Sequence, residues 1–278
     1  MLTLDNGTQM PLPAGIEIGA IPDLIPQKIT AYNQGSDGPT YNEAYNQYIA
    51  ERNAGIAAAG SLSAWVASGD AVGPIQELLI AYGMNARSSQ LVPSQAFQAV
   101  IEGLIGASLD WINRFALPLP MAPVALINPQ TGLSLSNELT NIYNILSAPS
   151  SVTVSGGFVA ASKTAHCLFP NLCLMIDGAH TGISYYNIDR ATYTPPLGIV
   201  EWSGWIGHQI MGVPNPSPRG AGRRSWGADQ FLAAIGVNQH IFEIWDAANG
   251  NAGLGAFLAL DPVSGTTGIP RIIDKVLW

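Results

Sequence analysis

Apolar residues recur at intervals of three and four along most of this chain. The clearest run follows Ser94, which we interpret as the cap of a helix that extends to Phe115. Its apolar members are Phe97, Val100, Ile101, Leu104, Leu109 and Ile112. This spacing places them on one face of an α-helix. Alternating patterns typical of half-buried strands are few, so we predict a mostly α, multi-helix globular domain.

The same pattern predicts a series of helices separated by Gly and Pro. They span 40–60, 61–68, 74–82, 94–115, 136–148, 158–169, 228–247, 254–262 and 270–278. Thr40 with Glu43 matches a capping box at the start of the first helix. Tyr41, Tyr45 and Tyr48 then share one side of that helix. We interpret this tyrosine stripe as a packing face rather than a ligand platform.

Two proline-rich segments suggest how the chain is divided. Residues 1–38 carry several prolines and a polar end, so we expect an irregular, extended N-terminal arm there. Residues 116–132 form a second proline-rich segment. We expect this segment to separate a first helical half, 39–148, from a second half, 149–278, with both halves in one compact domain.

Charge is scarce and mostly negative. Charged residues make up 11% of the chain and the net charge is −8. This balance argues against broad electrostatic capture of nucleic acid or of anionic membrane. It leaves room for a local basic site, and Arg219, Arg223 and Arg224 form the one basic cluster, in a Gly/Pro loop beside Trp226. Such a loop suits phosphate or carboxylate binding, or it is a solvated loop that offsets the acidic surface.

The chain shows no secretory signal and no long apolar run, so we expect a cytoplasmic protein with no membrane contact. Cys167 and Cys173 have no zinc-site spacing, and two buried thiols are favoured over a disulfide. Phosphate-loop and dinucleotide-binding motifs are missing, so we expect no cofactor. The sequence does not indicate an oligomeric state.

The stretch 156–186 contains most of the residues that could take part in catalysis or bind a metal. Lys163 and His166 share a face of the helix 158–169, and Asp177 follows a short apolar run. A buried lysine can have a lowered pKa and act as a nucleophile, with Asp177 positioning a water. The simpler interpretation is a Lys163–Asp177 ion pair that closes the turn. His166, Asp177 and His180 also suggest a metal site, although their spacing matches no standard pattern.

The C-terminal helix carries a second charged pair. Arg271 and Asp274 lie three residues apart on one helix face, a spacing that favours a structural contact between them. Arg271 reaching Asp177 is the alternative.

Two separated motifs resemble a group of bacterial proteins of unknown function. Ser162-Lys163-Thr164-Ala165-His166, followed by Pro170 and Ile176-Asp177, resembles their SKxLHxLxP and LFPxxD pattern. The closing sequence PRIIDKVLW resembles their RxxDKxLW helix. The resemblance covers residues 155–278 and implies no activity.

A weaker resemblance is to the helix-hairpin-helix base-excision DNA glycosylases. Lys163-Thr164-Ala165 resembles the KTA of their hairpin, and Ile176-Asp177-Gly178 resembles their catalytic aspartate segment. The resemblance implies a helix-hairpin-helix-like fold and DNA as a partner. It also implies that Lys163 is a Schiff-base lysine and that Asp177 assists base loss.

Three functional hypotheses follow from the sequence. The first is a nucleic-acid-binding protein or base-excision-like enzyme that uses Lys163 and Asp177, with the loop Arg219–Arg224 on the same face. The second is a non-enzymatic binding or interaction protein in which Lys163 and Asp177 form a buried structural clamp. The third is a small-molecule enzyme with a cleft lined by His166, Asp177 and His180.

Overall fold

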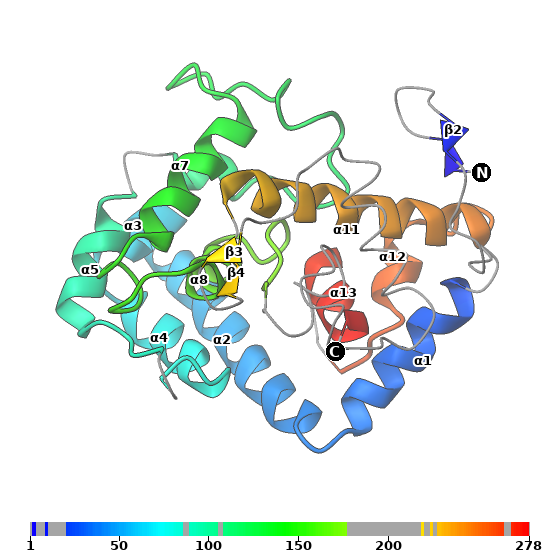
Figure 1. Cartoon of the computed structure of the whole chain (residues 1–278), viewed down its shortest axis with the longest axis horizontal. Helices are drawn as coiled ribbons and strands as arrows, with labels where there is room; N and C mark the ends of the chain where they lie inside the picture. Colours follow the sequence, from blue (N-terminus) through cyan, green and yellow to red (C-terminus); the bar gives the residue numbers. More distant parts are fainter. Residues whose placement is uncertain are drawn as a thin grey trace.

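Helices provide nearly all of the regular structure in the computed structural model (Figure 1). The structure describes residues 2–3, 9–10, 21–85, 89–104, 108–176, 218–219, 223–224, 227–263 and 268–277. The helices are α1 (Ile21–Gln34), α2 (Gly38–Ala59), α3 (Leu62–Ala67), α4 (Val72–Ala81), α5 (Ser94–Glu102), α6 (Leu109–Ile112), α7 (Leu135–Ser147), α8 (Phe158–Leu168), α11 (Ala228–Ala248), α12 (Gly253–Leu258) and α13 (Ile269–Leu277). The predicted mostly α, multi-helix fold is confirmed.

Among the residues that the structure describes, four two-residue strands form two antiparallel pairs. The first pair joins β1 (Leu2–Thr3) to β2 (Gln9–Met10). The second joins β3 (Pro218–Arg219) to β4 (Arg223–Arg224). Both pairs are local hairpins, so the core of the described fold is built by helices.

The last helix of the chain lies at the centre of the molecule. In Figure 1 α13 is drawn in red, with α11 crossing on one side and α1 and α2 forming a V on the other. α1, α11 and α12 all pack against α13, and every residue from Ile269 to Leu277 is buried. A helix that is buried all round takes its stability from its neighbours on every side. Elements from both ends of the chain therefore meet at α13.

One part of the predicted N-terminal arm is helical, and most of residues 1–20 lie outside the described residues. Residues 21–34 form the helix α1 instead of irregular structure. Pro22 lies in the first turn, where its missing N–H costs nothing. Ile25, Ile29 and Tyr32 then form a buried face at helical spacing. This packing outweighs Pro26, which the helix contains in its interior.

Two helix starts and one helix length were predicted wrongly. α2 begins at Gly38, with Pro39 in its first turn, so Thr40 lies inside the helix and forms no capping box. α5 is preceded by Pro93 as its N-cap residue, so Ser94 is already helical. The single helix predicted for 94–115 is two helices, α5 and α6. The break follows because Gly103 is a poor helix former and Ser108 has a left-handed φ of 73°.

The remaining helices lie where the apolar pattern predicts them, except that α12 ends at Leu258, four residues before the predicted end. α3 is capped by the Ser61 side chain, which accepts from the amide of Ala64, and Trp65 points inward with 2% of its surface exposed. α8 ends at Leu168, just before Pro170, as expected. None of the helices that the structure describes is long and apolar enough to span a membrane.

A glycine in α2 allows close contact with α3. A Cβ atom at Gly55 would lie 2.2 Å from Nε1 of the buried Trp65 side chain. We therefore expect Gly55→Ala to lower the free energy of unfolding by ~1–3 kcal/mol, measured by denaturant titration. Gly73→Ala is the matched control, because no atom lies within 4 Å of its Cβ position in α4. The control is expected to be neutral or to stabilise by up to ~1 kcal/mol. Equal stability of the two variants would contradict the close contact.

Candidate functional site

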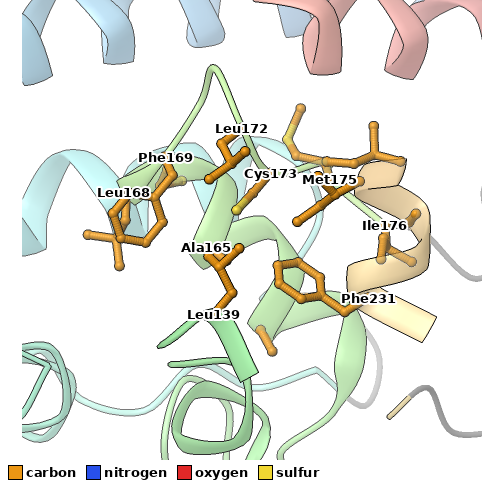
Figure 2. Close-up of a cluster of buried hydrophobic side chains, with 14 of the residues drawn as sticks. Leu139, Ala165, Leu168, Phe169, Leu172, Cys173, Met175, Ile176 and Phe231 are labelled. Carbon is orange, nitrogen blue, oxygen red and sulfur yellow. The ribbon is translucent and has the colours of Figure 1, made fainter. Parts of the chain in front are cut away.

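The helix α8 holds two of the three predicted catalytic residues in the protein interior. Every residue from Ala160 to Leu168 is buried, including Lys163 and His166. α8 packs against α7. Figure 2 shows apolar residues of α8 and of the following segment, 169–176, clustered with Leu139 of α7 and Phe231 of α11. The labelled members of this cluster are Leu139, Ala165, Leu168, Phe169, Leu172, Cys173, Met175, Ile176 and Phe231. The polar groups of α8 are therefore surrounded by a close-packed core.

Both ring nitrogens of His166 are already used inside the protein. Nδ1 lies 2.6 Å from the carbonyl oxygen of Cys173, and Nε2 lies 2.9 Å from the hydroxyl of Tyr45. Because a carbonyl oxygen only accepts, Nδ1 carries the hydrogen and Nε2 accepts from the tyrosine. Burial lowers the pKa of His166 to about 3. The imidazole is therefore neutral, and it links α2 to α8 and to the segment that follows α8.

Lys163 lies against the end of α4. Its side chain is 5% exposed, and Nζ donates to the main-chain carbonyl oxygen of Tyr82 at 3.3 Å. The same nitrogen lies 5.2 Å from the centre of the Tyr82 ring, within the range of a cation–π contact. The ammonium group thus joins α8 to the turn after α4.

The chain leading to Asp177 is fixed beside Lys163. The amide of Ile176 donates to the hydroxyl of Ser162 at 3.0 Å, and that hydroxyl is 3.2 Å from the Ile176 carbonyl oxygen. Ile176 is therefore fixed to α8 at Ser162, which directly precedes Lys163. Asp177 itself lies outside the described residues.

The end of α8 is capped by side chains from α2. The hydroxyl of Tyr48 donates to the carbonyl oxygen of Cys167 at 2.6 Å. Arg52 donates from Nε to the same oxygen at 3.1 Å and from Nη2 to that of Leu168 at 2.7 Å. These carbonyls have no partner within the helix, and a cation at a helix C-terminus is favourable. Arg52 therefore stabilises the position of α8.

A second group of buried charges surrounds Arg271 of α13. Its Nη1 forms an ion pair with Asp274 at 2.5 Å, so the contact predicted from their spacing is confirmed. Its Nη2 donates to the hydroxyl of Tyr32 at 3.2 Å and to the side-chain oxygen of Asn42 at 3.1 Å. The guanidinium carbon lies 4.6 Å from the centre of the Tyr45 ring. Tyr45 thus contacts both Arg271 and His166, and it connects the two buried groups.

Lys275 extends this group toward α12 and α1. Its Nζ lies 2.6 Å from Asp261 and donates to Asn33 at 2.9 Å. Burial lowers the pKa of Lys275 to about 8. The amine therefore remains mostly protonated at neutral pH, and the ion pair with Asp261 persists. It ties α13 to the turn after α12 and to the end of α1.

The predicted tyrosine stripe is confirmed as a packing face, and it includes polar residues that were not predicted. Tyr45 and Tyr48 are buried, and Asn42 and Arg52 lie on the same side of α2. Positions 42, 45, 48 and 52 are three or four residues apart, so helical spacing could have placed Asn42 and Arg52 on the tyrosine face. Arg52 belongs to this buried face because it donates to carbonyl oxygens at the end of α8.

Both cysteines are buried free thiols, as the sequence favoured. Burial raises the pKa of Cys167 to about 12 and raises that of Cys173 still further. Thiolates are the reactive form of cysteine, so neither residue is a nucleophile at neutral pH.

The other predicted site residues are only partly described. Arg219 pairs with Arg223 across the β3–β4 hairpin, and Arg224 pairs with Pro218. The structure describes only the backbone of these arginines, whereas Trp226 and His180 lie outside the described residues. In the part of the chain that the structure describes, no three His, Cys, Asp or Glu residues gather as a metal site would require.

Comparisons of the chain with protein-family models, with curated proteins and with solved structures found no match in any of the three. The functional argument therefore depends on the chemistry of the described residues.

The burial of His166 predicts a specific dependence of stability on pH. Its pKa is about 3 in the folded chain, against the ordinary value of 6.5 for a solvated histidine. Below pH 6.5 the unfolded chain therefore binds a proton that the folded chain does not. The free energy of unfolding should fall as the pH is lowered, by roughly 2 kcal/mol between pH 6.5 and 5 from this residue.

The measurement is denaturant unfolding at a series of pH values. His166→Gln should lose this part of the pH dependence, because glutamine does not titrate. His240→Gln is the control, since it removes a partly buried histidine of α11 that pairs with Glu243. Parallel curves for the wild type and His166→Gln would show that His166 titrates normally in the folded chain.

Proposed function

We propose that this chain is a non-enzymatic binding or interaction protein, in which Lys163 and His166 form a structural clamp. The observation that carries the proposal is the closed environment of α8. Lys163 is held against Tyr82, and both ring nitrogens of His166 are hydrogen-bonded within the protein. The sequence predicted a structural clamp of Lys163 and Asp177; because Asp177 lies outside the described residues, the term refers below to Lys163 and His166 with these partners.

The chemistry of these two residues supports a structural role. A general base must reach the substrate's proton within hydrogen-bond distance, and its pKa should lie near the working pH. His166 has neither property, because its nitrogens are occupied and its pKa is about 3. A Schiff-base lysine must present its amine to a carbonyl of the substrate. Lys163 instead directs its amine at a backbone oxygen in the interior.

A base-excision enzyme is the less supported function. Helix-hairpin-helix proteins bind phosphate through backbone amides of a glycine turn. Gly156 and Gly157 do precede α8 with φ values of 68° and 131°. Their amides, however, donate to the carbonyl oxygens of Thr153 and Ser147. These two donors are used within the protein, and the chain's net charge of −8 also disfavours phosphate.

The small-molecule enzyme with a His166, Asp177 and His180 cleft meets the same objection. Its central residue, His166, is fully buried and has no free ring nitrogen.

The test of the proposal is borohydride trapping with abasic-site and 8-oxoguanine duplexes at low salt. Wild type, Lys163→Ala and Asp177→Asn are compared, with Lys28→Ala as the control for a lysine on α1. We expect no covalent adduct and no gel shift with any of the four proteins. An adduct that forms with wild type and Lys28→Ala but not with Lys163→Ala would overturn the proposal.

The same variants test the structural clamp directly. Lys163→Ala removes a charged hydrogen bond and a buried side chain, so it should lower the free energy of unfolding by ~2–4 kcal/mol. Lys28 is half-buried, and Lys28→Ala should cost less than about 0.5 kcal/mol. Denaturant titration measures both values. A Lys163→Ala variant as stable as wild type would contradict the clamp even in the absence of an adduct.

A further inference from the structure

α2 and α4 pack side by side (Figure 1). A groove lined by residues of both helices lies between them. The groove has a volume of about 210 Å³. Its apolar lining comes from Ala44 and Tyr48 of α2 and from Leu78 and Ala81 of α4. Both helices also contribute an acidic residue to the lining, Glu51 from α2 and Glu77 from α4.

The sequence explains why the groove is open and how long it is. Ala44 and Ala81 are small, so the two helices leave space where larger side chains would interlock. In each helix the first and last lining residues are seven residue steps apart, from Ala44 to Glu51 and from Pro74 to Ala81. At 1.5 Å per residue this is about 10 Å, enough for one extended long side chain.

The acidic residues of the groove are available to a ligand. Glu51 accepts one hydrogen bond, from Gln47 at 2.9 Å, which orients its carboxylate. Glu77 is exposed and has no hydrogen bond or ion pair with any residue that the structure describes. The two carboxylates therefore have oxygen atoms that are not used within the described structure.

The sequence that builds α2 and α4 is acidic. Residues 29–85 contain five acidic residues and a single basic one, Arg52. Arg52 is buried and donates to the carbonyl oxygens at the end of α8. The field at the groove is thus set by carboxylates, which attract a cationic ligand and repel nucleic acid.

We propose that this groove is a docking site for a basic side chain, an arginine in preference to a lysine, presented by a protein partner. The methylene stem would lie on the apolar floor formed by Tyr48 and Leu78, as long basic side chains do on apolar surfaces. The guanidinium group would lie between Glu51 and Glu77. Arginine is favoured because its planar group offers five donors and pairs with carboxylates in a bidentate manner.

This inference depends on the proposed function, because it names the partner chemistry of a binding protein. Different results would overturn the groove proposal and the proposed function. A lysine-dependent adduct with DNA would overturn the binding-protein proposal, whereas the groove is tested without DNA and without changing Lys163.

The experiment is a titration of ¹⁵N-labelled full-length protein with a capped five-residue peptide that carries one central arginine among glycines. We expect saturable amide shifts that map to α2 and α4 around the groove, with millimolar affinity for a single side chain. The matched peptides carry citrulline, which has nearly the same shape without the charge, or lysine. Citrulline should bind at least about tenfold more weakly, and lysine should be intermediate.

Two double variants distinguish binding at the groove from a general effect of the protein's negative charge. Glu51→Gln/Glu77→Gln should weaken arginine-peptide binding by about tenfold, which corresponds to the loss of two exposed ion pairs. Asp70→Asn/Glu102→Gln removes two exposed charges outside the groove and should leave binding unchanged. Equal losses in both double variants, equal binding of citrulline, or no saturable shifts at the groove up to about 10 mM peptide would each overturn the proposal.

Discussion

The burial of charge in the last helix is the constraint on which the rest of the structure depends. Arg271, Asp274 and Lys275 all lie inside the protein on α13. Buried charges cost several kcal/mol each unless they are paired and hydrogen-bonded. The fold meets this requirement with Asp274 on the same helix, Asp261 after α12, and Asn42 and the tyrosines of α1 and α2. Helices from the two ends of the chain are held together because these partners must surround α13.

The buried polar residues of α8 are connected to the charges of α13 through α2. Tyr45 contacts Arg271 on α13 with its ring and binds His166 on α8 with its hydroxyl. Arg52, two turns further along α2, caps the end of α8. Lysine and histidine in this setting have their polar atoms satisfied within the protein, which supports the structural clamp. The side of α2 that carries Ala44 and Glu51 lines the groove shared with α4. The same helix therefore has one polar face in the interior and another at the surface.

The apolar pattern was sufficient to predict the fold class and most helices, but it could not give the charged partners. Periodicity located α8 and its end before Pro170, and residue spacing predicted the Arg271–Asp274 pair. The break after Gly103 was missed because the apolar spacing continues across it. The role of Arg52 was missed because its partners are backbone carbonyls more than one hundred residues away. Sequence spacing reports neighbours on one helix, whereas the buried polar groups come from α1, α2, α8 and α13 and from the turns after α4 and α12.

The most direct test of a closed interior is native-state reductive methylation, because this chain has three lysines, at positions 28, 163 and 275. Each would be followed by mass spectrometry before and after unfolding. The account predicts that Lys28 reacts in the folded protein and that Lys163 and Lys275 react only on unfolding. The lowered pKa of Lys275 would make it the most reactive amine if it were accessible, so its protection would report burial. Methylation of Lys163 at the rate of Lys28 in the folded protein would contradict the account.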